Sequence, residues 1–385
     1  MDTHGNIEKY RQMRKKKMLR KRIITWIAVV ILIGLVVVSF ERFFNMESSG
    51  NPFTGTESGA TSKGFPISLL GERIVDLKSM NGWLLSLTES KFTVYTNSGK
   101  YVSSDIHGFL NPVLKPAHSN AIIYDRKGYN IKLVTQNSIL KEKTFSETIQ
   151  FAELSDDGKI AVVSSDSNAS SVLKIYNSKF EEIYKWSSSS FIAGLAFNDS
   201  NKGLVALTYT VKNGEFTSSI VALNFSQEKI LFEQKIPETL GLSVSVKRNG
   251  NIAVIGDVGA HIFDKKGTLK GSYTYNKQII AMSNDADKNM IIVLSDTDSK
   301  TNNEIVILDD GCKVIHNYKL EAKIKDISCD GSRLLLLGND YIYDFDMSLR
   351  LLDKMPCKKD NKKMTFIGSN AYVAGVERIA TMAVN

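Results

Sequence analysis

One segment of the chain, SDTDSKTNNE at residues 295–304, contains the residue types that calcium sites use. Carboxylate and amide oxygens at alternate positions are hard ligands, which calcium prefers in proteins. The four candidate ligands are Asp296, Asp298, Asn302 and Glu304. Lys300 stands among them and would repel a cation, and the segment lacks the glycine that a sharp binding loop needs. A solvated loop is therefore favoured over a calcium site, and both interpretations stay open.

The other residues capable of chemistry do not form a recognisable catalytic pattern. His107, His118, His261 and His316 are scattered, without a second histidine or a carboxylate at metal-ligand spacing. No GxSxG nucleophile motif, P-loop or HExxH motif occurs in the sequence. The sequence thus assigns no catalytic residue and no cofactor.

Three cysteines, Cys312, Cys329 and Cys357, lie in the last third of the chain, and none is part of a CxxC motif. An odd number leaves at least one thiol unpaired. We expect free thiols that behave as small hydrophobic side chains, with one disulfide as the alternative.

The elements that would position any site come from an internal repeat. Eight times a polar turn is followed directly by a short apolar strand, as in Asp157-Gly158 before KIAVV. The second turn residue falls at positions 82, 120, 158, 203, 250, 289, 331 and 370. A period of about 40 residues made of short strands is typical of four-stranded propeller blades. The sequence therefore predicts an all-β propeller over residues 65–385.

The number of hairpins predicts how the ring closes. Seven of the repeats end in an outer hairpin, whereas the eighth provides three strands before the chain ends. One strand pattern without a partner, FPISLL at Phe65–Leu70, precedes the first repeat. Placed on the edge of the last blade, it would complete that blade and cover an unpaired edge. We therefore predict eight blades, with seven as the alternative.

The N-terminal region predicts a membrane anchor. Residues 1–22 contain nine Lys or Arg against two acidic residues, and residues 23–40 contain no charge and no proline. A stretch of this length and composition suits a single transmembrane helix, and flanking cations place the N-terminus in the cytoplasm. Bulky residues at its end favour an uncleaved signal anchor. Residues 41–64 form a polar linker, so residues 65–385 are expected to be extracytoplasmic.

The same distribution of charge bears on partners. Most of the net charge of +8 lies in the basic tail, so the propeller is nearly neutral and nucleic-acid binding is not expected. The tail and residues 23–40 are expected to contact membrane lipid. The longer insertions at 166–171, 212–219 and 296–304 all fall between second and third strands, on one rim of the ring. Loops of this kind are where we expect a partner.

The segments LSDDGKIAVV at Leu154–Val163 and DISCDGSRLLLLG at Asp326–Gly338 resemble the blades of WD40-like, TolB-like and PQQ-like propellers. The complete layout looks like a family of bacterial membrane-anchored propeller proteins of unknown function. The resemblance implies an architecture and no activity. Only Trp83 and Trp186 lie in the domain, too few for the recurring blade tryptophan that quinone-binding relatives need.

Two functions remain open at this stage. The first is a non-catalytic binding or scaffolding module that holds a protein or cell-envelope partner near the membrane. The second is an enzyme that processes an envelope glycan or peptide, with paired carboxylates at the propeller channel. The absence of a catalytic motif favours the first.

Overall fold

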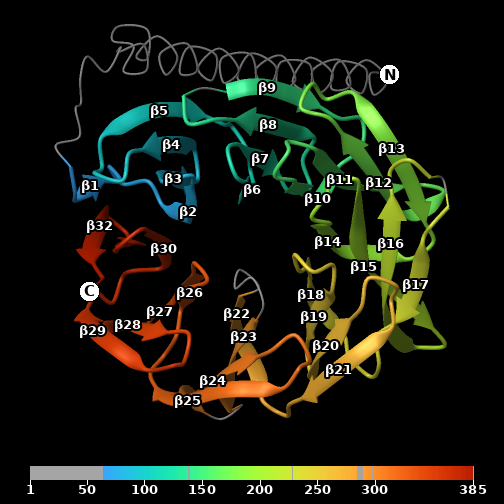
Figure 1. Ribbon diagram of the computed structural model, residues 1–385. Helices are drawn as coiled ribbons and strands as arrows, with labels where there is room; N and C mark the ends of the chain where they lie inside the picture. Colours follow the sequence, from blue (N-terminus) through green and yellow to red (C-terminus); the bar gives the residue numbers. More distant parts are fainter. Residues whose placement is uncertain (1–63, 138, 228, 284–288, 297–298, 385) are drawn as a thin grey trace, which may run out of the picture. The chain divides into compact units, whose positions relative to one another are not determined.

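The computed structural model describes residues 64–137, 139–227, 229–283, 289–296 and 299–384. Within these residues the strands form eight antiparallel sheets of four, arranged around a central channel as the blades of a propeller (Figure 1). The all-β fold and the count of eight blades are thus confirmed, and the alternative of seven is wrong. None of the described residues belongs to a helix that is long and apolar enough to span a bilayer. The predicted tail and anchor lie outside the described residues.

We call the four strands of each blade A to D, from the channel outward. The A strands are β2 (Ile74–Met80), β6 (Pro112–Pro116), β10 (Ile149–Leu154), β14 (Phe191–Phe197), β18 (Gly241–Val246), β22 (Gln278–Ser283), β26 (Asp326–Cys329) and β30 (Lys363–Ile367). The B strands are β3 (Trp83–Thr88), β7 (Ala121–Asp125), β11 (Ile160–Asp166), β15 (Gly203–Lys212), β19 (Ile252–Gly256), β23 (Met290–Asp296), β27 (Arg333–Leu337) and β31 (Asn370–Ala374). The C strands are β4 (Lys91–Tyr95), β8 (Asn130–Val134), β12 (Ala169–Tyr176), β16 (Glu215–Asn224), β20 (Gly259–Phe263), β24 (Ser299–Leu308), β28 (Tyr341–Asp346) and β32 (Arg378–Ala383). The D strands are β5 (Tyr101–Ile106), β9 (Ile139–Thr144), β13 (Glu182–Ser188), β17 (Phe232–Lys235), β21 (Leu269–Thr274), β25 (Val314–Glu321), β29 (Leu351–Pro356) and, for the eighth blade, β1 (Ile67–Ser68).

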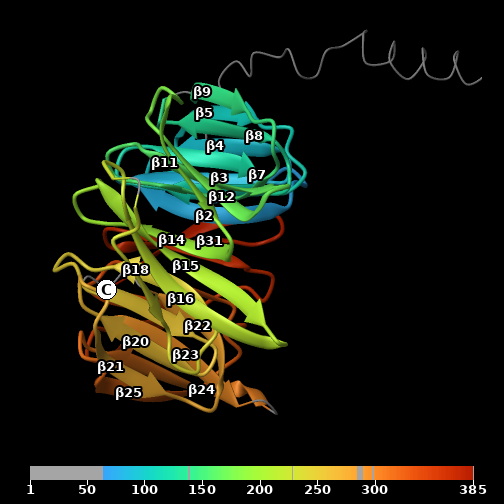
Figure 2. The ribbon, with the colours of Figure 1, turned by 90° about the vertical axis from the view of Figure 1, so that its right-hand side faces the viewer.

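The antiparallel order gives the ring two different faces. Turns from A to B and from C to D lie on one face, the AB/CD face. Turns from B to C and the connections from D to the next A lie on the other, the BC/DA face. Figure 2 views the ring from its side, with the AB/CD face to the left.

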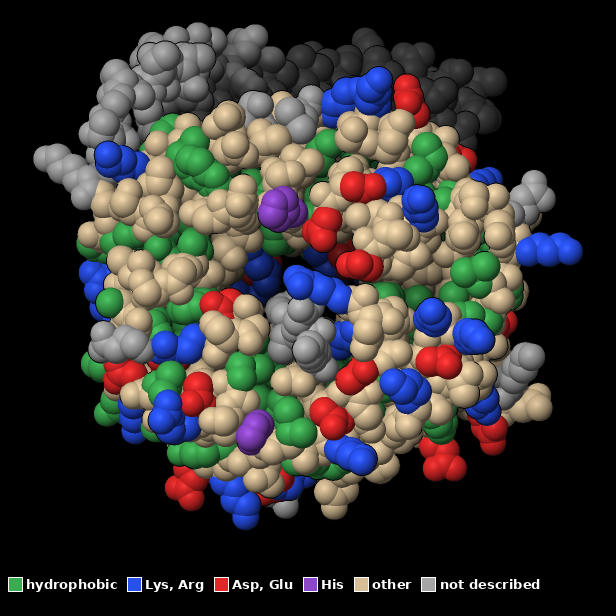
Figure 3. Space-filling view, viewed as in Figure 1, with side chains coloured by type: hydrophobic (Ala, Val, Ile, Leu, Met, Phe, Trp, Pro, Cys, Tyr) green, Lys and Arg blue, Asp and Glu red, His purple; other side chains and the backbone are tan. Residues whose placement is uncertain are grey.

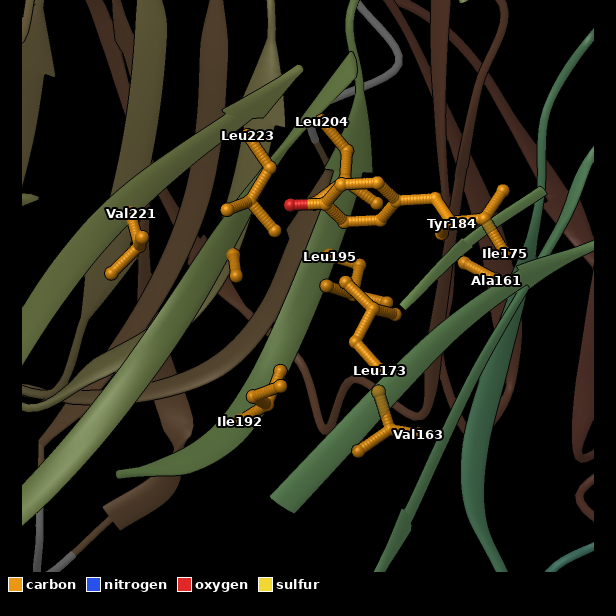
Figure 4. Close-up of a cluster of buried hydrophobic side chains, with 11 residues drawn as sticks. Ala161, Val163, Leu173, Ile175, Tyr184, Ile192, Leu195, Leu204, Val221 and Leu223 are labelled. Atoms are coloured by element: carbon orange, nitrogen blue, oxygen red, sulfur yellow. The ribbon is translucent and has the colours of Figure 1, made fainter. Parts of the chain in front are cut away.

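The core consists of hydrophobic clusters between blades, one at each of the eight junctions. The run Leu334–Leu337 shows why the B strands are continuously apolar. Leu334 and Leu336 pack towards the sixth blade, whereas Leu335 and Leu337 pack towards the eighth. Burying each such side chain contributes about 1.5–3 kcal/mol. Figure 4 shows the equivalent packing between the third and fourth blades, around Tyr184 and Leu195.

Several C-to-D hairpins share one pattern of hydrogen bonds between a side chain and the backbone. Asp346 accepts hydrogen bonds from the backbone amides of Ser348 and Arg350 through one carboxylate oxygen. The hydrogen bond from the Ser348 hydroxyl, together with these two amide bonds, lowers the pKa of Asp346 to about 2. Three other hairpins use the same spacing, at Asn177, Asp264 and Asp309. Short polar side chains that bond to the backbone two and four residues ahead explain why Asn and Asp mark these turns.

The N-terminal strand closes the ring as predicted. β1 pairs with β32, so the eighth sheet has the order β1-β32-β31-β30. The paired stretch is shorter than the predicted Phe65–Leu70, because only Ile67 and Ser68 are in register with β32. Beyond them, the amide of Leu69 donates to the carbonyl of Glu377 at 2.8 Å. Ile67 and Leu69 are buried in the cluster between the eighth and first blades.

The three long insertions are strands rather than the expected loops. Residues 203–212 and 215–224 pair continuously, with Lys212 opposite Glu215 and a turn at Asn213-Gly214. β11 and β12 likewise pair to Asp166 and Ala169, and β23 and β24 to Asp296 and Ser299. The physical reason is that the inserted residues continue the cross-strand pairing of their hairpin. This pairing gives their backbone amides and carbonyls hydrogen-bond partners, which an unpaired loop would lack.

Candidate functional site at the central channel

The A strands line the channel and divide it into two different sectors. Charged side chains come from the blades on one side: Asp76, Lys78, Lys115, Glu153, Asp326 and Lys363. In the fourth to sixth blades the equivalent positions hold small neutral residues: Gly194, Ala196, Ser243, Ser245, Ala281 and Ser283. Figure 3 shows acidic and basic side chains around the opening on the AB/CD face.

The charged sector joins neighbouring blades. Lys115 of the second blade donates to Glu153 of the third, with a distance of 2.5 Å between Nζ and Oε1. Lys363 of the eighth blade lies 3.9 Å from Asp76 of the first. Asp326 of the seventh blade accepts a hydrogen bond from the Met364 amide of the eighth at 2.8 Å. These contacts hold the inner ring together across three blade junctions.

Burial raises the pKa of two of these carboxyl groups. For Glu153, burial raises the pKa and the nearby ammonium of Lys115 opposes the shift. For Asp326, burial again raises the pKa, opposed by the hydrogen bond from Met364 and by the charge of Lys363. In both groups the partners favour the ionised form and oppose the effect of burial.

Replacing Lys115 by Met should reveal this dependence as a function of pH. Without the ammonium, the folded-state pKa of Glu153 rises further above its unfolded value near 4.3. A raised folded-state pKa favours the folded state most at low pH, and this advantage is lost as pH rises through the folded pKa. The loss of unfolding free energy relative to the unmodified protein should therefore be largest at pH 7 and small at pH 4, in urea titrations.

The double variant Lys115→Met with Glu153→Gln provides the control. It removes the buried charge together with its partner, so it should be close to the unmodified protein at pH 7. A deficit for Lys115→Met that is equal at both pH values would contradict the role given to this pair.

Two cavities open along the channel wall of the second to fifth blades. One has a volume of about 450 Å³ and includes Lys115, Arg126, Gln150, Ala193 and Leu242 in its lining. The other, of about 380 Å³, lies at the A-to-B turns and is lined by polar and charged residues: Asp156, Asn198, Asp199, Lys247 and Arg248. Glu153 and Leu195 line both, so the two cavities adjoin at the ion pair of Glu153.

The candidate calcium segment lies away from the channel, on the hairpin of β23 and β24. Asn302 donates to Asp296 at 2.9 Å, and Glu304 accepts from Lys277 at 2.9 Å. Lys277 also lies 3.6 Å from Asp296, so an ammonium group occupies the space between the two carboxylates. Asp298, the fourth candidate ligand, lies outside the described residues. Calcium binding here stays a prediction, and it would require displacement of Lys277.

Two of the histidines are buried and hydrogen-bonded. Nδ1 of His107 accepts from the amide of Phe109 at 3.0 Å, and Nε2 lies 3.1 Å from the carbonyl of Thr88. His261 lies within hydrogen-bond distance of Thr239 and Ser272. Burial lowers the pKa of both imidazoles. In the described part of the chain, no group of three or more His, Cys, Asp or Glu residues is arranged to hold a metal ion, and all three cysteines are free.

Sequence reasoning missed the channel residues, although their signal is visible. Charged residues interrupt the first strands of several repeats at alternate positions, as in Asp76 and Lys78 of RIVDLKS and Glu153 of IQFAELS. Charges that alternate with apolar residues are equally typical of an ordinary half-exposed strand. Assigning the charges to a channel requires knowing that these strands are innermost.

Comparison with solved structures finds propellers at low sequence identity. BamB from Moraxella catarrhalis is 10% identical with a TM-score of 0.57, covering 82% of this chain and 97% of that chain. Sqt1 from Saccharomyces cerevisiae is 14% identical with a TM-score of 0.61, covering 83% and 98%. Hsv2 from Kluyveromyces lactis is 13% identical with a TM-score of 0.52, covering 75% and 99%. At this level of identity the likeness shows the fold alone.

No curated protein matches the sequence. A family described as a family of unknown function, DUF5711, matches residues 71–383, which contain all eight A strands and every D strand except β1. The chain therefore belongs to this family of unknown function, and its own fold is an eight-bladed propeller.

Proposed function

We propose that this protein is a membrane-anchored binding module whose propeller lies outside the cytoplasm and holds a protein or cell-envelope partner. The observation that carries the proposal is the set of polar and ionic contacts that join neighbouring blades around the channel. Lys115, Glu153, Asp76, Lys363 and Asp326 join neighbouring blades, which stiffens the scaffold. A rigid ring presents the turns of its two faces in fixed positions, and binding residues commonly lie on such turns.

The anchor and the orientation rest on the sequence. Residues 23–40 are long and apolar enough to cross a bilayer, and the nine cations before them favour a cytoplasmic N-terminus. The chain joins the propeller at β1, so the ring would be tethered through the seam between its eighth and first blades.

Topology can be tested by thiol labelling of two single-cysteine variants in which the native cysteines are replaced. In cells stripped of outer envelope layers, a membrane-impermeant maleimide should label Asn213→Cys at once. It should label Thr3→Cys only after the membrane is permeabilised. Labelling of Thr3→Cys in sealed cells, with Asn213→Cys protected, would refute the proposed orientation.

An enzyme that processes an envelope glycan or peptide is the second candidate, favoured by the cavity of about 380 Å³. Glu153, whose pKa is raised by burial, lines this cavity together with Asp156 and Asp199. Two carboxyl groups that line one pocket can act as general acid and general base. Purified propeller incubated with cell-wall glycan or peptide should release soluble fragments if this candidate is correct. An Asp199→Asn variant should then lose that release.

A further inference from the structure

An exposed apolar strip runs across the BC/DA face at the junction of the fourth and fifth blades. We define the apolar strip as Phe191, Val211, Phe216, Leu242 and Val258, which are 55%, 49%, 71%, 44% and 41% exposed. Large apolar side chains are usually exposed one at a time on a protein surface, and a group of them marks an interaction site.

Contacts along the two blades connect the members of the strip. Phe191 pairs with Tyr209 across β14 and β15, and Val211 pairs with Phe216 across the hairpin. Tyr209 packs into the cluster between the fourth and fifth blades, and its hydroxyl donates to the carbonyl of Gly241, beside Leu242. Alternation along a strand puts Val211 on the same side as Tyr209, over the fifth blade.

The strip also reaches the channel and the fifth blade's B-to-C turn. Leu242 is the extra residue of a bulge in β18, and it lines the cavity of about 450 Å³. The amide of Asp257 donates to the carbonyl of Leu240 at 3.0 Å, which holds the turn containing Val258 next to the strand of Leu242. An occupant of the strip would thus extend from the hairpin tip to the channel mouth.

The charges described around this sector of the face are mainly acidic. Glu215, Glu238 and Asp257 are exposed. Further out, Asp296 and Glu304 both contact Lys277. A second copy of the chain docked here about a twofold axis would place these carboxylates against one another, and like charges oppose such a contact. An anionic lipid surface would be repelled for the same reason.

The first described residues, Gly64 and Phe65, lie on the face of the ring opposite the apolar strip. Gly64 lies against the carbonyl of Ser98, in the C-to-D turn of the first blade, and Phe65 packs beside Gly99 of the same turn. Gly64 and Phe65 therefore lie at the AB/CD face, whereas the apolar strip lies on the BC/DA face.

The hairpin of β15 and β16 offers main-chain groups as well as side chains. β17 covers β16 only from Ala222 to Ser219, and the Ile236 amide bonds to the carbonyl of Ser218. Among the described residues no strand lies beside the outer edge of residues 215–217. An extended segment can add to such an edge through backbone hydrogen bonds.

We propose that the apolar strip docks an extended segment of a partner protein in which apolar side chains alternate with Lys or Arg. This inference rests on the proposed binding function and adds the face and the chemistry of the partner. Alternate apolar side chains would lie on Phe216, Val211 and Leu242, and the cations would meet Glu238 and Asp257.

The test uses the full-length chain in intact cells, with a photoreactive phenylalanine analogue at position 216. Ultraviolet light should crosslink it to one protein, and mass spectrometry should map the link to a segment with apolar residues alternating with Lys or Arg. The matched control carries the analogue at Val376, which is 51% exposed at the B-to-C turn of the eighth blade. Position 376 should give no link to the same segment.

A synthetic peptide of the mapped segment then measures affinity for the purified propeller. Phe216→Ser should weaken binding about tenfold or more, as for a central apolar contact. Glu238→Lys should weaken binding and reduce its dependence on salt, because it removes an attractive charge. Val376→Ser should bind like the unmodified protein. Unchanged thermal unfolding of all three variants confirms that the fold is intact.

Other results would overturn the inference. Crosslinks from position 216 to lipid, to a second copy of the chain, or to nothing would exclude the partner segment. If the analogue on the AB/CD face at position 199 captures a specific partner while position 216 does not, the binding function stands and this face is wrong. If neither position captures a specific partner, the proposed binding function fails too.

Discussion

A propeller that starts at Gly71 is expected to unfold at a markedly lower urea concentration than one that starts at residue 61. Removing β1 exposes the edge of β32 and deletes the buried side chains of Ile67 and Leu69. Losing the burial of two such side chains costs about 3–6 kcal/mol of unfolding free energy. The open edge should also promote association between molecules, which light scattering would detect.

The control is a domain that starts at residue 45, which retains β1 and adds part of the linker. It should unfold together with the domain that starts at residue 61. If the domain without β1 is as stable as the other two, the eighth blade does not depend on the N-terminal strand and the closure has no energetic role.

The second large effect is expected at an ion pair in the seventh blade whose carboxylate is fully buried. Asp344 on β28 is fully buried, and Nε of Arg333 on β27 lies 2.9 Å from one of its oxygens, while Nη2 bonds to the other. Arg333→Met would leave a buried carboxylate without its cation. Breaking a buried pair in this way costs about 3–5 kcal/mol, which equilibrium unfolding at pH 7 would measure.

A matched pair in the same blade separates burial from charge. Arg350 bonds to Asp346 at 3.1 Å, but the Arg350 side chain is 75% exposed. Arg350→Met should therefore cost no more than about 1 kcal/mol. Arg333→Met combined with Asp344→Leu should recover most of the lost stability, because both charges are removed. Similar effects for Arg333→Met and Arg350→Met would show that burial of Asp344 is unimportant.

The architecture was predictable because each blade repeats the same local chemistry. A polar turn followed by an apolar B strand recurs eight times, and the orphan strand before the first repeat matches the missing strand of the last. Polar C-to-D turns, such as those at Asp309 and Asp346, also mark the hairpins in the sequence. Their side chains form hydrogen bonds with the backbone of the same turn, so the residue type is tied to the turn.

The site was less predictable because it depends on contacts between distant residues. Lys277 lies between Asp296 and Glu304 from another loop, so a local reading of residues 295–304 could not include it. Lys115 and Glu153 come from different blades, and neither is unusual in its own strand. The sequence predicts a loop where the ends of β15 and β16 pair, because the turn at Asn213-Gly214 is flanked by other polar residues and does not stand out.

Closure by β1 has a mechanical consequence. Any pull on the chain before Gly64 reaches the ring first at a clasp of two paired residues, Ile67 with Ile379 and Ser68 with Arg378. In the other blades the D strand follows directly after the C strand of its own blade in the sequence. Those D strands are therefore not the first to bear this load. Under such a force the pairing of β1 with β32 would break first. The ring would then open between the eighth and first blades before any hairpin within a blade is extended.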